Sequence, residues 1–295
     1  MRGEADVPSD VPSGPASSGT VPFRAPEPRL PDGVSAVLDQ TCRAAVGGVN
    51  AAWNRWDRAG LVEEVRLGAD GTPTYRIDEI VETAILEAAE SHGVNVLSEE
   101  AGFLDNGSAV TLAVDPLDGS ANAAAGVPLS CFSAALFIDS EPVEALSCWL
   151  ENGHTVWARA GTPVGFTTSG ARRLQGAAVD MLRPKRHAGG DSTAAFVRVA
   201  QSAGRIRVLS TTCLEAMLVA QGSVDAFADP GSNTHRVVDL AAAMLLVPAA
   251  GGAVLDAFGQ RVEFDVDLGR RWSGVVAATE DLAAELAEVI SATSS

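Results

Sequence analysis

The spacing of hydrophobic positions predicts helices near the start of the chain and strands after them. Apolar residues recur every three or four positions over 34–59 and over 78–91, as they do along the buried face of an amphipathic helix. The segment 62–75 holds short strand-like pieces around the turn Ala69-Asp70-Gly71. Uncharged or loosely alternating runs then predict strands at 94–97, 110–114, 129–138, 142–150 and 154–158. Residues 33–160 are therefore predicted to form an α+β half.

After residue 160 the pattern changes to an alternation of strands and helices. Strands are predicted at 178–182, 206–209, 224–228 and 275–278, and helices at 192–203, 214–221, 237–249 and 282–290. Gly251-Gly252 follows the long apolar helix and is a common helix stop. This alternation predicts an α/β second half, residues 161–295. Residues 1–32 are rich in Pro, Ser and Gly and have almost nothing to bury, so we expect a disordered leader.

The most informative stretch is Val114-Asp115-Pro116-Leu117-Asp118-Gly119-Ser120, which completes a buried strand. Pro116 has no N–H to donate, so strand pairing is expected to end there. Two carboxylates beside a bare carbonyl form the all-oxygen ligand set that Mg²⁺ prefers, and the amides of Gly119 and Ser120 can face a phosphate oxygen. A plain turn is the alternative, because Asp, Pro and Gly are the usual turn formers.

Other acidic positions gain meaning from this stretch. Asp78 and Asp239 each stand near the start of a predicted helix, where a cap or an interaction with the helix dipole is the ordinary explanation. Glu99 and Glu100 follow the strand 94–97, and paired glutamates at a strand end are usually solvated. Two strand ends that carry acids can nevertheless converge if their strands lie close together in one sheet.

Composition narrows the class of protein. A chain of 295 residues with 46% hydrophobic content can bury a full core. The net charge of −17 argues against nucleic acid or an anionic membrane as a partner, and no apolar run approaches the length of a membrane span. The four cysteines lack Cys-x-x-Cys spacing, which fits reduced core thiols in a cytoplasmic protein. The basic run Arg183-Pro184-Lys185-Arg186-His187 is either a solvated loop or a clamp for a second phosphate.

The motifs, taken in order, resemble the inositol monophosphatase family of Mg²⁺-dependent, lithium-sensitive sugar phosphatases. They are Asp78, Ser98-Glu99-Glu100, Asp115 to Ser120, Asp239-Leu240-Ala241-Ala242 and Gly251-Gly252. The resemblance covers about residues 34–290. The region from Cys213 to Asp239 is most similar to the archaeal branch, in which inositol monophosphatase and fructose-1,6-bisphosphatase activities often coexist. The resemblance implies a layered α-β-α-β-α sandwich, two or three Mg²⁺ ions and a homodimer.

The resemblance also implies a ligand set. Glu99, Asp115 and the carbonyl of Leu117 would hold one Mg²⁺ ion. Asp115, Asp118 and Asp239 would hold a second ion, so that Asp115 bridges the two. A third, weaker ion would lie near Glu99.

Further roles follow from the same resemblance. Asp78 and Ser120 stand where the family has an Asp–Thr pair that orients the attacking water, and with Glu99 they are the expected catalytic residues. A serine hydroxyl can replace the threonine hydroxyl chemically. The expected substrate contacts are Asp118, Gly119, Ser120, Thr211, Thr212, Asp229 and Asp239.

Several departures from the family pattern bear on the substrate. Ala121 and Ala123 replace a threonine and a bulky aromatic, and Val238 replaces a tryptophan. The family's lysine before the first aspartate is absent, since Lys185 is the only lysine and lies elsewhere, and Arg76 is a candidate substitute. These changes leave the preference for inositol phosphate over another sugar phosphate open.

The leading hypothesis is a Mg²⁺-dependent phosphomonoesterase that hydrolyses inositol monophosphate or a related sugar or cyclitol phosphate with a metal-activated water. A second hypothesis is another phosphatase of the superfamily, acting on fructose 1,6-bisphosphate, histidinol phosphate or a nucleotide 3′-phosphate. A third is a catalytically dead relative that serves as a binding protein, against which stands the complete set of acids at the metal positions.

Overall fold

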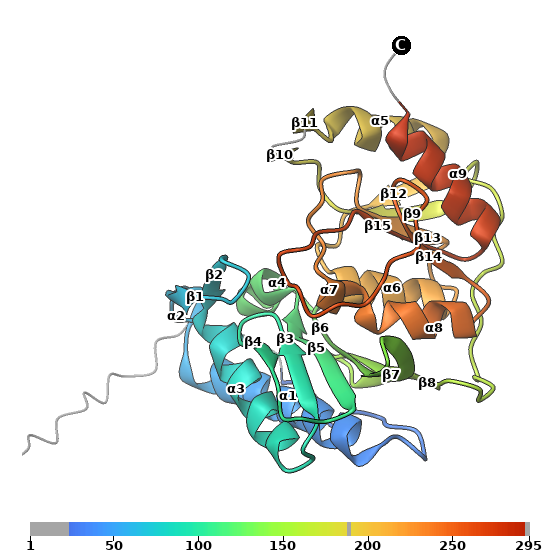
Figure 1. Cartoon of the computed structure of the whole chain (residues 1–295). Helices are drawn as coiled ribbons and strands as arrows, with labels where there is room; N and C mark the ends of the chain where they lie inside the picture. The colour runs from blue at the N-terminus through green and yellow to red at the C-terminus, as the bar shows by residue number, and fades with distance from the viewer. Residues whose placement is uncertain (1–23, 188–189, 293–295) are drawn as a thin grey trace, which may run out of the picture.

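The computed structural model describes residues 24–187 and 190–292, which form two stacked lobes (Figure 1). The first half of the chain makes one lobe and the second half makes the other (Figure 1). The elements of the first half are α1 (Ala36–Arg55), α2 (Arg58–Leu61), β1 (Glu64–Leu67), β2 (Pro73–Tyr75), α3 (Arg76–Glu90), β3 (Asn95–Ser98), β4 (Gly102–Leu104), β5 (Val110–Asp118), α4 (Ser120–Ala125), β6 (Cys131–Ile138), β7 (Glu141–Trp149) and β8 (His154–Arg159).

The second half alternates strands and helices, as predicted. Its elements are β9 (Ala178–Met181), β10 (Arg186–His187), β11 (Gly190–Asp191), α5 (Thr193–Ser202), β12 (Arg205–Arg207), α6 (Thr212–Ala220), β13 (Ala226–Ala228), α7 (Val237–Ala241), α8 (Ala243–Ala249), β14 (Ala253–Asp256), β15 (Gly274–Ala277) and α9 (Glu280–Ser291). No helix in the described ranges is long and apolar enough to cross a membrane.

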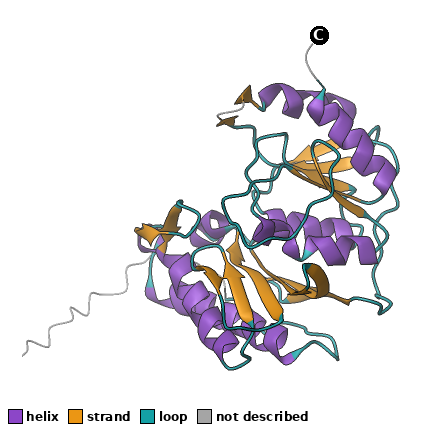
Figure 2. Ribbon diagram, viewed as in Figure 1, coloured by secondary structure: helices purple, strands orange, loops and turns teal. Residues whose placement is uncertain are grey.

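A six-stranded sheet in the order β4-β3-β5-β6-β7-β8 forms the centre of the first half. β3 and β5 run parallel, and the other neighbouring pairs are antiparallel. Successive side chains of a strand point to opposite faces of the sheet. Leu112 and Val114 of β5 therefore share one core with Leu38 of α1 and Ile77 of α3. The two helices cover this face of the sheet (Figure 2).

The other face of the same sheet packs against α6 and α8. Ala113 and Phe137 from this face share a core with buried residues of both helices. The same core includes Phe227 and Val276 from a second sheet, which has the order β12-β9-β13-β15-β14. α5 and α9 pack against the far side of that sheet. The layers thus run α-β-α-β-α, which confirms the predicted fold class.

Two predicted elements differ from the structure. β5 does not end at Pro116: the pairing with β6 is irregular between Asp115 and Asp118 and then resumes, with Asp118 opposite Cys131. A missing N–H removes one hydrogen bond of the ladder, and the strand continues beyond the gap. The predicted helix 237–249 is divided into α7 and α8 at Ala242, a position at which the sequence holds no helix breaker.

The part of the expected leader that the structure describes lies against the first lobe. The side chain of Asn50 exchanges two hydrogen bonds of 2.9 Å with the backbone of Ala25. The N–H of Arg29 donates to the carbonyl of Gly153 at 2.8 Å, and the Thr155 hydroxyl donates to the carbonyl of Arg29. Residues 24–32 thus have specific partners, while residues 1–23 of the expected leader lie outside the described residues.

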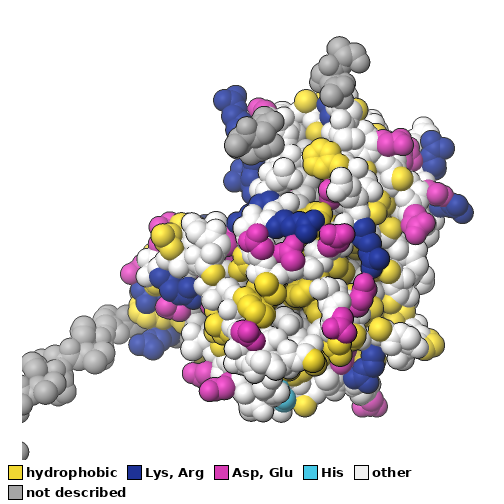
Figure 3. Space-filling view, in the orientation of Figure 1, with side chains coloured by type: hydrophobic (Ala, Val, Ile, Leu, Met, Phe, Trp, Pro, Cys, Tyr) yellow, Lys and Arg dark blue, Asp and Glu magenta, His cyan; other side chains and the backbone are white. Residues whose placement is uncertain are grey.

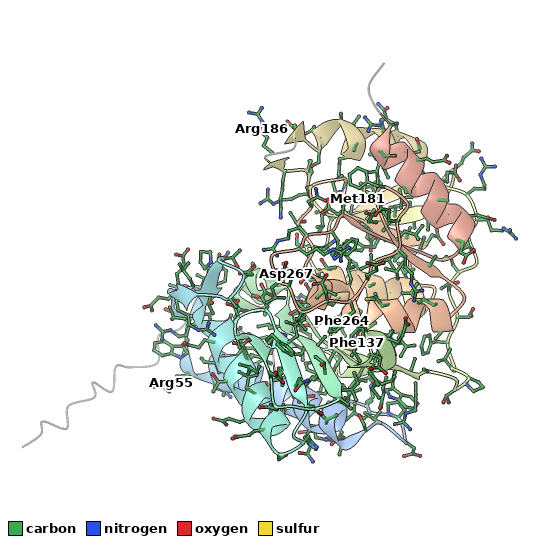
Figure 4. The ribbon with its side chains drawn as sticks, in the orientation of Figure 1. Arg55, Phe137, Met181, Arg186, Phe264 and Asp267 are labelled. Carbon is green, nitrogen blue, oxygen red and sulfur yellow. The ribbon has the colours of Figure 1, made fainter. Side chains whose placement is uncertain are left out.

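The segment between β14 and β15 returns from the second half to the first. Phe264 in this segment stacks on Phe137 of β6, with ring centroids 3.8 Å apart and planes within 12° of parallel (Figure 4). Further along, Arg271 forms an ion pair of 3.3 Å with Asp70 in the connection between β1 and β2. The second half therefore contacts the first half both at β6 and at the β1–β2 connection.

Candidate metal centre

The irregular end of β5 presents two carboxylates and one carbonyl. Asp115 is 2% exposed, and its Oδ1 accepts a hydrogen bond of 3.2 Å from the N–H of Leu117. The carbonyl of Leu117 accepts the hydroxyl of Ser120 at 3.0 Å. A carbonyl oxygen has two lone pairs, so this one retains the capacity to bind a cation.

Asp118 faces the start of α6 in the other half of the chain. Its carboxylate oxygens accept the backbone N–H groups of Thr212 at 3.1 Å, Cys213 at 2.8 Å and Leu214 at 3.3 Å. The first N–H groups of a helix have no partner within it, so an outside carboxylate satisfies them and interacts well with the helix dipole. Burial and the charge of Asp239 nevertheless raise the pKa of Asp118 to about 7, although the three amides act to lower it.

The turn after β3 carries Glu99 and is held by a buried glutamate of α3. Oε1 of Glu82 accepts the Ser98 hydroxyl at 2.6 Å and the N–H groups of Glu100 and Ala101 at 3.1 and 3.0 Å. Glu82 is 2% exposed, and Arg66 neutralises its other oxygen at 2.9 Å. This clamp fixes the backbone on both sides of Glu99, at the end of β3 that pairs in parallel with β5.

The start of α7 brings the last acid and one arginine. The N–H of Arg236 donates to Oδ2 of Asp239 at 2.7 Å. This oxygen therefore caps α7, as the ordinary explanation from the sequence predicts. The guanidinium of Arg236 contacts Asp239 again and extends to Glu99 and Asp70. Figure 3 shows basic and acidic side chains next to one another where the two halves meet.

These acids form two overlapping groups that could hold a metal ion. Oxygens of Glu99, Asp115 and Asp239 lie within 4.8 Å of one another, and so do ligand atoms of Asp115, Asp118 and Cys213. Asp115 belongs to both groups, as the predicted bridging position requires. Asp239 is grouped with Glu99 here, and the predicted second ion held by Asp115, Asp118 and Asp239 stays a prediction.

The electrostatics of the centre fit a bound cation. Burial raises the pKa of Glu99 to about 8, and burial together with Asp118 and Glu99 raises the pKa of Asp115. Arg236 opposes both shifts and does not cancel them. The cluster therefore holds more negative charge than its protein neighbours neutralise. Buried carboxylate oxygens with a charge surplus are the donor set that a hard divalent cation such as Mg²⁺ requires.

Asp78 and Ser120, the expected pair for orienting water, are in contact. A hydrogen bond from Ser120 and one from the N–H of Tyr75, at 3.3 Å, lower the pKa of Asp78. Burial outweighs both and raises that pKa to about 7. Asp78 also caps α3, because its side chain accepts the N–H of Tyr75. The ordinary explanation from the sequence is therefore correct, and it does not exclude a role beside the centre.

The expected substrate residues divide into two sets. Gly119 has φ of +81°, and a Cβ there would lie 2.6 Å from Cγ2 of Thr211, so only glycine fits this turn. The Thr211 hydroxyl is buried and has no hydrogen-bond partner among the described residues, which leaves it available to a ligand. The Thr212 hydroxyl pairs with Nε2 of His235 at 3.1 Å.

Asp229 forms the second set by itself. It is fully buried, and its two oxygens accept the backbone and hydroxyl groups of Ser232 and Thr234 at 2.6–3.2 Å. Its carboxylate thus holds the loop after β13, and its contact with substrate stays a prediction. Arg76, the candidate substitute for the absent lysine, pairs with Glu63 at 2.5 Å and stacks over Trp56.

Sequence reasoning missed four residues of the centre. Asp70 lies in the predicted turn Ala69-Asp70-Gly71, and Glu82 lies on the predicted helix 78–91 among other polar residues. Arg236 directly precedes the predicted helix 237–249, and Cys213 is one of the expected core thiols, although its Sγ lies 3.6 Å from Oδ2 of Asp115. The sequence offered one signal for Arg236, namely its position three residues before Asp239. No signal marked the other three.

Buried carboxylates at the ends of two parallel strands and a helix, beside a tight glycine turn in five α-β-α-β-α layers, define a metal-dependent phosphomonoesterase. The chain belongs to the inositol monophosphatase family, whose family model matches residues 34–295. This family depends on metal ions.

Individual proteins agree with this assignment. The chain is 33% identical over 225 residues to the fructose-1,6-bisphosphatase/inositol-1-monophosphatase of Thermococcus kodakarensis, covering 75% of this chain and 84% of that protein. It is 31% identical over 237 residues to the protein of the same name from Methanothermobacter thermautotrophicus, with coverages of 75% and 84%. The fold matches a Pyrococcus horikoshii protein described as similar to inositol-1 monophosphatase, with a TM-score of 0.73, 23% identity and coverages of 87% and 97%.

Proposed function

We propose that the chain hydrolyses the monophosphate esters of a cyclitol or sugar, such as inositol monophosphate, in a Mg²⁺-dependent reaction at the acidic cluster. The observation that carries the proposal is the convergence of Glu99, Asp115 and Asp239 within 4.8 Å, with Asp118 beside them. The acids that a dead relative would lack are present, with Asp115 and Asp239 buried and Glu99 and Asp118 partly exposed. The names of the curated relatives, which include inositol-1-monophosphatase, support the same substrate class.

Mg²⁺ would be held by Glu99, Asp115, Asp118, Asp239 and the carbonyl of Leu117, where it would supply the Lewis acid that activates water and stabilises a leaving oxygen. The chain's own groups do the rest. Ser120 donates its one hydroxyl proton to the carbonyl of Leu117, and its oxygen, which lies close to Asp78, can accept a hydrogen from water. The amides of Gly119 and Ser120 at the tight turn are suited to phosphate oxygens. The unpaired hydroxyl of Thr211 is suited to a substrate hydroxyl.

A fructose-1,6-bisphosphatase is the second candidate function. Lys185 is half-buried at the edge of the site, within electrostatic range of Asp229 and Asp239. Burial and Arg183 lower the pKa of Lys185. Arg186 of the same run is 91% exposed and pairs with Asp191, which fits a solvated loop. Lys185 and Arg183 are therefore the part of the basic run that would contact a second phosphate.

The test is a phosphate-release panel with inositol 1-phosphate, fructose 1,6-bisphosphate, histidinol phosphate and a nucleotide 3′-phosphate, each with Mg²⁺ and with EDTA. We expect Mg²⁺-dependent release by the wild type and a loss of more than about a hundredfold in Asp115→Asn. Asp105→Asn changes an exposed acid in a loop and is the matched control. Near wild-type turnover by Asp115→Asn, with an unchanged need for Mg²⁺, would show that the ligand assignment is wrong.

Two finer features belong to the same proposal. The protein would act as a homodimer, which analytical ultracentrifugation can test directly. It would act in the cytoplasm, and the four cysteines support this because all are buried and free of disulfide bonds.

A further inference from the structure

Arg236 occupies the middle of the acidic cluster. Its Nη1 lies 2.8 Å from Oδ2 of Asp70 and also bonds to Glu99, while its Nη2 lies 3.2 Å from Oδ1 of Asp239. The side chain is only 16% exposed. One planar guanidinium therefore joins carboxylates from three separate places: the β1–β2 connection, the turn after β3 and the start of α7.

Two of these carboxylates belong to the group that could hold a metal ion. Among the described residues, Arg236 is the only basic side chain that forms an ion pair with Glu99 or Asp239. A guanidinium and a divalent cation repel each other strongly at the distance of a shared carboxylate. Each cation therefore weakens the binding of the other to Glu99 and Asp239. The contact also explains why Asp239 is grouped with Glu99 rather than with Asp118.

We propose that Arg236 is an internal counter-ion, which keeps the metal-free site assembled and must release Glu99 and Asp239 before a divalent cation binds them. The inference rests on the proposed function, because it takes these two acids as metal ligands. It adds that the chain carries its own competitor for the metal. The affinity for Mg²⁺ is then lower than the carboxylates alone would give, and turnover follows the Mg²⁺ concentration over a higher range.

Asp70 gives the released guanidinium a place to stay. Its side chain is 1% exposed, and Arg271 contacts the same Oδ2 at 3.3 Å. Arg236 can therefore leave Glu99 and Asp239 without leaving Asp70. The β1–β2 connection remains attached to the second half in both states, and the change is limited to one side chain.

The experiment measures Mg²⁺ binding to the full chain after metal removal, by calorimetric titration with Mg²⁺ alone, and the melting temperature in EDTA. Arg236→Gln removes the guanidinium and keeps the backbone contact of 2.7 Å to Asp239. Arg271→Gln is the matched control, since it removes a guanidinium bound to Asp70 with no ion pair to Glu99 or Asp239 among the described residues. Melting temperature against Mg²⁺ concentration provides a second measure of affinity for any variant too unstable for calorimetry.

We expect Arg236→Gln to bind Mg²⁺ at least about tenfold more tightly than the wild type, since a hydrogen bond between charged groups corresponds to a factor of this order. Its melting temperature in EDTA should fall, because the acids then lack their counter-ion. Arg271→Gln should bind Mg²⁺ within about twofold of the wild type.

Equal or weaker Mg²⁺ binding by Arg236→Gln would overturn the inference. An equal gain in both variants would also overturn it, since net charge alone would then explain the result. A wild type that takes up no Mg²⁺ would overturn the proposed function and this inference together. Uptake by the wild type without a gain in Arg236→Gln would overturn the inference alone.

Discussion

Glu82 offers the sharpest test of how the centre is held together. Its carboxylate is 2% exposed and accepts hydrogen bonds from the Ser98 hydroxyl, from two backbone amides of the turn that carries Glu99, and from Arg66. Glu82→Ala removes all four acceptor contacts at once. We expect both the stability of the protein and its affinity for Mg²⁺ to fall, because the turn that carries Glu99 then loses its anchor on α3.

The expected loss of stability in Glu82→Ala follows from the groups that are left without a hydrogen-bond partner. Ser98 is fully buried and Glu100 is 6% exposed, so their donors cannot easily reach water. A buried unsatisfied donor costs about 1–3 kcal/mol. Arg66 is 35% exposed and recovers much of its loss by hydration. Relief of the desolvation of Glu82 itself offsets part of the total, which leaves a loss of about 3 kcal/mol in the free energy of unfolding.

Urea unfolding in EDTA measures this loss, and Mg²⁺ titration of the folded variant measures the second effect. Glu79→Ala is the control, because Glu79 also pairs with Arg66 but is 42% exposed and 3.6 Å away. It should lose less than about 0.5 kcal/mol. If Glu82→Ala unfolded within about 1 kcal/mol of the wild type, or kept full Mg²⁺ affinity, the clamp would not be what positions Glu99.

Three further predictions concern the mechanism, the chain start and pH. Ser120→Ala should lower kcat by about 10²–10⁴-fold while Mg²⁺ binding is kept, and Ser120→Thr should retain substantial activity; near-normal kcat in the alanine variant would remove the hydroxyl from the mechanism. Deleting residues 1–23 should leave the melting temperature unchanged, whereas deletion to residue 32 should lower it through loss of the Asn50 and Gly153 contacts. Without metal, burial raises the pKa values of Asp78, Glu99 and Glu215 to about 7, 8 and 9, so the folded state binds more protons than the unfolded state. The melting temperature in EDTA should therefore fall as the pH rises from 5 to 9. A rise would contradict these shifts.

Much of the fold could be predicted because local pattern and burial agree. The amphipathic run 34–59 became α1, and the uncharged run 110–114 became the buried part of β5. Pairing β3 and β5 as parallel neighbours places the acids after them at one edge, as the sequence suggested. The family, the layered fold and the phosphomonoesterase class predicted from the motifs are confirmed by the comparisons.

The remainder depends on contacts between distant parts of the chain. Asp70 and Arg236 are 166 residues apart, and nothing local marks either as the partner of the other. Asp229 shows that partners close in the sequence can be missed as well. Its contact with substrate stays a prediction, and the sequence did not reveal that the hydroxyls of Ser232 and Thr234, a few residues ahead, donate to its oxygens. Which of several possible donors reaches a carboxylate is decided by packing, and periodicity does not report it.

The centre concentrates carboxylates that repel one another, and the fold supplies positive potential from two directions. The start of α6 donates three amides to Asp118, and Arg236 bonds to Glu99 and Asp239. Asp115 receives neither a helix terminus nor a guanidinium contact among the described residues, and burial with its acidic neighbours raises its pKa. A metal ion is the remaining source of positive charge. Asp115 is therefore the residue whose neutralisation should depend most on Mg²⁺, and that is why its replacement by asparagine is the first variant to make.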